Sequence, residues 1–163
     1  MSPGKEKRRT ARTIAGATIV AGVVVSIPIL IAEPLIVRLL FGEGFSGSVD
    51  VGRVLLVAAM VFALNRVLEA LLQAEGRPLD SSVGEAIGLA VTAAGLALLL
   101  PLIGIMGAGI TSLLAYSASA IFLVRRATRA LDVSTAQLLI PDRETFSRLV
   151  RMATLGRAAL NRR

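Results

Sequence analysis

Four polar side chains interrupt an apolar stretch near the middle of the chain. Residues 54–64 contain nothing more polar than a methionine, and Asn65, Arg66, Glu69 and Gln73 follow within nine positions. In an α-helix of 3.6 residues per turn, Arg66, Glu69 and Gln73 share one face and Asn65 lies at its edge. A guanidinium, a carboxylate and two amides on one face can pair with each other or bind an anionic group.

Two interpretations of this polar stripe remain open. Arg66 lies eight residues before Ala74, which places it about 12 Å inside the helix end at about 1.5 Å per residue. An arginine at the bilayer centre costs about 2.5 to 3.5 kcal/mol on insertion scales. In the first interpretation Arg66 snorkels and is neutralised by Glu69, while Asn65 and Gln73 bridge neighbouring helices. In the second, the stripe faces an aqueous cavity and Arg66 meets an anionic substrate headgroup.

Other charged residues are candidates to extend this site. Arg38 and Arg53 lie near the outer ends of their apolar runs, where they can either continue a cationic path or snorkel to the interface. Glu85, near the start of a later apolar run, is a candidate partner for Arg66 or Arg77.

The composition excludes most enzyme chemistry. The chain has no Cys and no His, so disulfides, thiolate metal sites and the commonest near-neutral general base are absent from the sequence. No acid–base or nucleophile constellation is present among the remaining residues. We therefore expect no catalytic residues, no metal, no cofactor and no enzyme activity.

The bulk composition indicates a membrane protein. Hydrophobic residues make up 55% and charged residues 18% of the 163 residues, and the mean hydropathy is +0.75. A soluble domain carries about 25% charged residues. The net charge of +7 does not indicate nucleic-acid binding, because aromatic residues are only 4% and the basic residues flank the apolar runs.

Four apolar runs are long enough to cross a hydrocarbon core about 30 Å thick, which needs roughly 20 helical residues. The predicted fold class is therefore all-α: a polytopic membrane protein with four transmembrane helices plus a basic amphipathic C-terminal tail. The predicted segments are a basic cytoplasmic segment at 1–12, spans at about 13–41, 51–74, 83–100 and 103–124 within a transmembrane domain at 13–124, and a cytoplasmic tail at 125–163.

Two features inside these spans predict their shape and packing. Pro28 and Pro34 each remove a backbone hydrogen bond, so the first span should be kinked or end in a separate half-turn. Small residues recur every three or four positions in the last two spans and should let their backbones approach closely. These residues are Gly84, Gly88, Thr92 and Gly95 in one, and Gly104, Ala108, Ser112, Ala115 and Ser119 in the other.

The basic residues predict the orientation. With both termini cytoplasmic, fifteen of the eighteen Lys and Arg residues lie on the inner side, and only Arg38 and Arg53 on the outer side. In the tail, Ser134 and Gln137 form a capping-box pattern. Residues 141–163 are predicted to include a basic amphipathic helix, which could lie on an anionic inner leaflet, serve only as a positive-inside tail or bind a partner.

Three motifs in order resemble a known family. "EPLIVRLLFGEGF", an apolar helix ending "LLQAEGRP", and "LLLPLIGIMGAGITSLLAY" are similar to the C-terminal part of the polysaccharide or oligosaccharide flippases, within the multidrug/oligosaccharidyl-lipid/polysaccharide exporter superfamily. The matching elements are Pro34 to Phe45, Ala74 to Pro78 and Pro101 to Ala108, and the likeness covers about residues 10–124.

The resemblance implies transport of a lipid-linked oligosaccharide across the bacterial cytoplasmic membrane by alternating access between two helical lobes. A central cationic cavity that holds the pyrophosphate would give Arg66 a role, with Glu69, Asn65, Gln73 and Arg38 as further substrate-binding candidates. Family members have many more spans, so four would supply only the end of the second lobe. The chain is then a fragment or a subunit that needs the remaining helices or subunits, or one that has lost transport.

A different class of function is also open. The chain can instead be a small four-helix membrane scaffold or accessory protein in envelope polysaccharide assembly, with no transport activity of its own. Under either hypothesis its expected partners are membrane lipids and other membrane helices, and the lipid-linked sugar is a partner under the first alone.

Overall fold

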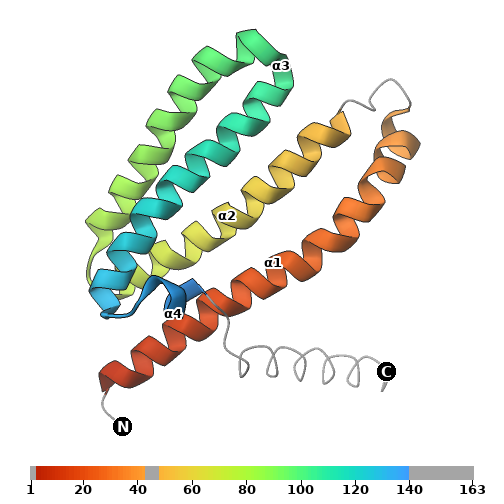
Figure 1. The fold of residues 1–163 in the computed structure, drawn as a ribbon. Coiled ribbons are helices and arrows are strands. Elements are labelled where there is room, and N and C mark those ends of the chain that lie inside the picture. Colours follow the sequence, from red (N-terminus) through yellow and green to blue (C-terminus); the bar gives the residue numbers. More distant parts are fainter. Residues whose placement is uncertain (1–2, 43–47, 140–163) are drawn as a thin grey trace, which may run out of the picture.

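The described part of the protein is helical. The computed structural model describes residues 3–42 and 48–139, and all of its regular elements there are helices (Figure 1). The helices are α1 (Pro3–Phe41), α2 (Ser48–Ala74), α3 (Pro78–Leu131) and the short α4 (Thr135–Leu139). The predicted amphipathic segment at 141–163 lies outside the described residues.

Three of these helices are long and apolar enough to cross a membrane, where the sequence predicted four separate ones. They are Thr13–Leu40 within α1, Ser48–Ala74 and Pro78–Leu131. The predicted third and fourth spans are two arms of the single helix α3, a first arm at 78–102 and a second arm at 105–131. The all-helical, membrane-type fold is confirmed, whereas the described residues form three long helices instead of four, and the third begins at Pro78 instead of the predicted 83.

A glycine turn explains why two predicted spans form one bent element. A straight helix of 54 residues would be about 80 Å long, far more than a bilayer core. Instead the backbone leaves the helical region at Ile103 (φ −133°, ψ 19°) and Gly104 (φ 58°, ψ −141°), just after Pro101. The second of these conformations is accessible almost only to glycine. The two arms therefore run back alongside each other with no separate loop (Figure 1).

Close backbone approach holds the two arms together. A Cβ added to Gly84 would lie 2.8 Å from a methyl carbon of Leu123, and one added to Gly95 would lie 2.6 Å from Thr111. The predicted small-residue face of the first arm is thus confirmed at these two glycines. On the second arm the contact face passes through Thr111, Ala115 and Ser119, so only the last two of its predicted residues lie on it.

The predicted small residues that lie outside this contact face have other environments. Ala108 and Ser112 are half-buried, and the Ser112 hydroxyl donates to the Ala108 carbonyl of its own helix at 3.0 Å. Thr92 does the same within the first arm, donating to the Gly88 carbonyl at 2.9 Å. A serine or threonine can satisfy its hydroxyl in this way without any neighbouring helix.

The N-terminal helix α1 runs unbroken through Pro28 and Pro34 and curves along its length (Figure 1). The prolines therefore leave one continuous helix, and the predicted separate half-turn is wrong. At its N-terminal half α1 meets α2, the second arm and α4 in a compact apolar core. This core consists of Ala15, Leu68, Leu72, Leu123, Ala127, Leu131 and Leu138.

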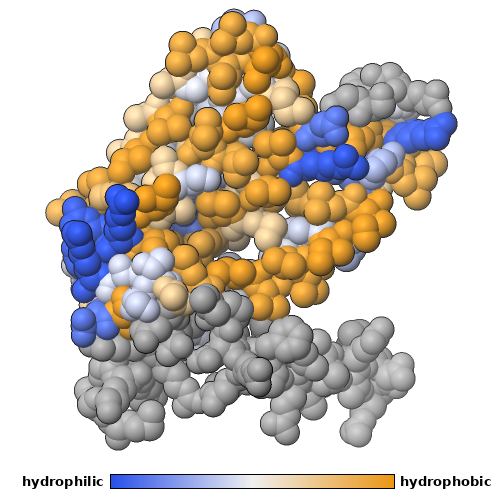
Figure 2. All heavy atoms as spheres, viewed as in Figure 1, coloured by the Kyte–Doolittle hydropathy of each residue, from blue (hydrophilic) through white to orange (hydrophobic). Residues whose placement is uncertain are grey.

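The surface has the distribution expected of a membrane protein. On the face shown in Figure 2, hydrophilic residues gather near the α2–α3 turn and near the end of α1 and the start of α2, and apolar residues cover most of the remaining described surface, including the tip of the α3 hairpin. Large apolar side chains point outward along every long helix, among them Ile31 at 75%, Leu39 at 74% and Leu89 at 71% exposure. Exposed apolar area of this extent is stable in lipid and not in water. The length and composition of the helices thus fit a membrane location.

Candidate functional site

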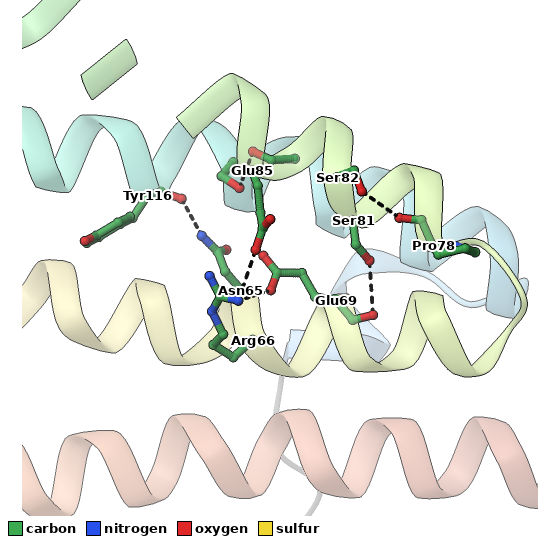
Figure 3. Close-up of polar contacts among 10 residues, drawn as sticks. Asn65, Arg66, Glu69, Pro78, Ser81, Ser82, Glu85 and Tyr116 are labelled. Atoms are coloured by element: carbon green, nitrogen blue, oxygen red, sulfur yellow. Dashed lines mark hydrogen bonds and ion pairs between the residues drawn. The ribbon is translucent and has the colours of Figure 1, made fainter. Parts of the chain in front are cut away.

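Arg66 is the centre of an ion-pair cluster between α2 and the first arm (Figure 3). Its guanidinium Nη1 lies 2.9 Å from Glu69 Oε2 and 3.1 Å from Glu85 Oε1. The Glu69 side chain is 6% exposed, whereas those of Arg66 and Glu85 are 52% and 55% exposed. The cluster therefore has a buried inner carboxylate and an open outer face.

Asn65 connects this cluster to the second arm. Its side-chain amide Nδ2 donates to the backbone carbonyl of Tyr116 at 3.0 Å, and its Oδ1 has no hydrogen-bond partner within the described residues. The Tyr116 ring packs against Phe62 with centroids 5.0 Å apart, and the Arg66 guanidinium lies 4.7 Å from the Phe62 ring centroid. A cation over an aromatic face is attracted by the ring quadrupole, which adds to the two ion pairs.

These groups line a small polar pocket of about 190 Å³, which is formed by α2 and both arms of α3. With its three ionisable groups charged, the Arg66 cluster has one net negative charge, because one arginine faces two glutamates. The pocket is lined by Phe62, Asn65, Arg66, Glu69, Glu85, Gly88, Leu89, Thr92, Tyr116 and Ser119.

Local structure fixes the walls of the polar pocket. Gly76, at φ 72°, ends α2 in a left-handed turn, and the Arg77 amide donates to the Leu72 carbonyl at 2.9 Å. The first arm then starts at Pro78, at a position that suits proline, and runs back along α2. A buried hydrogen bond from the Ser81 hydroxyl to the Glu69 carbonyl, 3.2 Å long, joins the two helices.

The two arms of α3 are also tied by polar contacts. The Ser119 hydroxyl donates to the Gly84 carbonyl at 2.8 Å. At the end of the bundle, the Asp80 carboxylate forms ion pairs with Arg77 at 2.7 Å and with Arg126 at 3.4 Å. These ion pairs join the start of the first arm to the end of the second. These contacts hold Glu85 and Tyr116 in register with Arg66.

The structure brings together three of the five predicted site residues. Asn65, Arg66 and Glu69 lie in one cluster, and the predicted Arg66–Glu69 pair is present. Gln73 lies exposed in the last turn of α2 and Arg38 lies exposed in the last turn of α1, and neither lines the polar pocket. Substrate binding by any of the five stays a prediction.

Other pocket residues were identified only in part from the sequence. Glu85 had two candidate partners, and the structure pairs it with Arg66. Thr92, Ser119 and the Tyr116 carbonyl enter the site from α3 because of the register between its arms, which no local pattern encodes. Across the described ranges, no group of three or more Asp, Glu, His or Cys residues is arranged to hold a metal ion.

Comparison with known proteins does not identify a family for this chain. No protein-family model, curated protein or solved structure matches the chain. The resemblance to the flippases therefore rests on the three sequence motifs.

Proposed function

We propose that the chain is a fragment or subunit of a flippase that moves lipid-linked oligosaccharide across the bacterial cytoplasmic membrane by alternating access. In this proposal α1, α2 and the two arms of α3 are four transmembrane segments. The observation that carries the proposal is the open outer face of the Arg66 cluster, which is set in an otherwise apolar surface.

Charged side chains at the depth of this open face in a membrane need water or polar protein groups beside them. Arg66 is about 12 Å from the end of α2, and more than half of its side chain and of Glu85 is exposed. Charged groups at such depth normally face a bundle interior or a water-filled cavity, because exposure to lipid tails is costly. Further helices that enclose water on this side would supply such a cavity, as a two-lobed transporter does.

The ion pairs suggest how an anionic headgroup would bind. Arg66 already holds two carboxylates, so a pyrophosphate would have to displace one of them. Glu69 is buried on the same helix, whereas Glu85 is half-exposed and belongs to the first arm. Exchange of Glu85 for the substrate phosphate would remove the Arg66–Glu85 ion pair between α2 and the first arm and leave the Ser81–Glu69 hydrogen bond in place, so the arm could pivot about its start, a motion suited to alternating access.

The arrangement of the helix ends supports the proposed orientation with both termini cytoplasmic. The start of α1 lies at the same end of the molecule as the α2–α3 turn and α4 (Figure 1). Arg77, Arg126 and Arg129 belong to this end, so the basic residues that predict a cytoplasmic side lie together.

The proposal is tested in the cells that carry the protein, by measuring lipid-linked oligosaccharide on the inner leaflet. Arg66→Ala should cause the same accumulation as deletion of the chain, because the phosphate loses its cation. Arg53→Ala is the matched control, since Arg53 is a half-exposed arginine paired three residues away in the same helix. Background accumulation in both the deletion strain and Arg66→Ala would reject transport.

A scaffold without transport activity is the second candidate, and the full pairing of Arg66 favours it. Two carboxylates and an aromatic ring already satisfy the guanidinium, as expected of a structural cluster that docks partner helices. If Arg66→Ala leaves oligosaccharide export unchanged but dissociates a defined membrane complex, the scaffold is the correct function.

A further inference from the structure

A second hollow lies on a different face of α2 and has the opposite character. It has a volume of about 460 Å³, within the range of about 300 to 1,000 Å³ typical of small-molecule sites. Its walls come from α2, the second arm of α3 and α4. We call it the apolar groove, and it is lined by Val61, Leu64, Ser117, Ala120, Ile121, Val124, Arg125, Thr135 and Leu139. It shares no residue with the polar pocket.

The polar groups of the apolar groove gather at one end. Arg125 and Thr135 belong to the end of the molecule where the second arm finishes and α4 begins, and the walls farther along α2 are apolar except for the Ser117 hydroxyl. A site with one charged end and a long apolar remainder matches an amphiphile. Arg125 directly follows the last apolar run, which places its guanidinium at the headgroup level of a membrane.

Within the part of the chain that the structure describes, no carboxylate is paired with Arg125 at that end. Arg126, the next residue, is paired with Asp80 at 3.4 Å, whereas the Arg125 side chain is exposed and has no ion pair within residues 3–42 and 48–139. Among its described lining residues, the groove therefore offers one guanidinium without an ion pair and no carboxylate. Basic pockets between membrane helices on the cytoplasmic side bind anionic lipid headgroups, since phosphate oxygens match guanidinium geometry.

From these observations we infer that the apolar groove binds an anionic glycerophospholipid, with its phosphate on Arg125 and one acyl chain along Ile121, Val124 and Leu64. The lipid would join α2, the second arm and α4 as a structural component. A net negative headgroup is favoured over a zwitterionic one, because the amine of a zwitterionic lipid already compensates the phosphate. The inference does not depend on the proposed transport function, because it concerns a separate face of α2.

Native mass spectrometry of the purified full chain tests the inference with phosphatidylglycerol and phosphatidylcholine of identical acyl chains. The wild type should bind phosphatidylglycerol about fivefold more tightly, in line with about 1 kcal/mol for each basic residue at an anionic surface. Arg125→Gln should remove this preference and Arg125→Lys should keep most of it. Arg129→Gln is the control, because Arg129 is an exposed arginine one turn farther along and does not line the groove.

A second pair of variants tests the acyl-chain half of the site. Ile121→Trp should fill the groove and weaken both lipids, whereas Leu98→Trp should weaken neither, since Leu98 is 65% exposed on the other arm. Both positions are exposed, so neither change should prevent folding. Inorganic phosphate at millimolar concentration should not displace the lipid.

Several outcomes would overturn the inference. These are equal retention of phosphatidylglycerol by Arg125→Gln and wild type, unchanged binding by Ile121→Trp, or displacement of the lipid by phosphate alone. A wild type that binds phosphatidylglycerol and phosphatidylcholine equally well would also overturn the inference.

Discussion

Removal of the Arg66 guanidinium should destabilise the helix bundle through Glu69. In Arg66→Ala, Glu69 keeps a side chain that is only 6% exposed and loses its cation at 2.9 Å. Loss of one partner from a buried ion pair costs about 3 to 5 kcal/mol, because the other charge is left buried and uncompensated. Arg66 itself is half-exposed, so we expect the lower end of this range, about 3 kcal/mol, or about a 100-fold smaller folding constant.

The control and the assay follow from the same geometry. Arg53 pairs with Asp50 at 3.3 Å, also three residues away in α2, but its partner is 68% exposed. Exposed pairs contribute about 0.2 to 1 kcal/mol, so Arg53→Ala should have little effect. The assay is thermal unfolding of the detergent-solubilised chain carrying a C-terminal fluorescent fusion. Arg66→Ala should lower the midpoint temperature of unfolding by about 6 to 12 °C, at about 2 to 4 °C per kcal/mol.

A double variant separates a structural ion pair from simple loss of contacts. Replacing both charges by apolar side chains, as in Arg66→Met with Glu69→Met, should recover most of the lost stability, because no charge then remains buried in the pair. If Arg66→Ala unfolds no earlier than Arg53→Ala, or if the double variant is as unstable as Arg66→Ala, burial of Glu69 does not determine the stability of the cluster.

Two further predictions concern the hairpin of α3. Gly107→Ala should destabilise the chain by about 1 to 3 kcal/mol, because the new Cβ would lie 2.6 Å from the carbonyl carbon of Leu99. Gly88→Ala is the control and should be tolerated, because its nearest contacts would lie at 3.8 Å. Equal midpoint temperatures of unfolding for the two variants would contradict the close approach at Gly107. The chain has no cysteine, so Leu79→Cys and Leu102→Cys, at 79% and 75% exposure near opposite ends of the first arm, can be labelled alone. A membrane-impermeant maleimide should reach only position 102 in intact cells, and labelling of both positions or of 79 alone would contradict the proposed orientation.

Most of the fold was predictable from hydropathy, since the predicted spans at 13–41 and 51–74 coincide with α1 and α2 to within a few residues apart from the N-terminal extension of α1. The prediction failed where an apolar pattern continues past a charge. The second arm reaches Leu131, beyond the predicted end at 124, because Leu123, Ala127 and Leu131 follow each other at helical spacing and all are buried. Of the arginines between them, Arg125 and Arg129 are exposed and Arg126 is paired with Asp80, so their charge does not end the helix.

The candidate site was predictable only within one helix. Helical spacing alone placed Arg66 beside Glu69, because residues three apart lie on one face. The contributions of Glu85 and Tyr116 depend on how the arms of α3 pack against α2. That register is set by the glycine turn and by the close approach at Gly84 and Gly95, which are tertiary contacts.

The helix α2 forms a wall of both the polar pocket and the apolar groove, so lipid binding in the groove could change the geometry of the Arg66 cluster. The second arm of α3 also borders both, through Tyr116 on one side and Ile121 on the other. Within the described residues, the 3.0 Å hydrogen bond from the Asn65 amide to the Tyr116 carbonyl joins α2 to this arm. A lipid in the groove can influence the Arg66 cluster by shifting the arm against α2, because both elements border the two sites. Such an influence requires the lipid to bind two positions of the arm with different affinity, since a ligand that binds both equally changes neither.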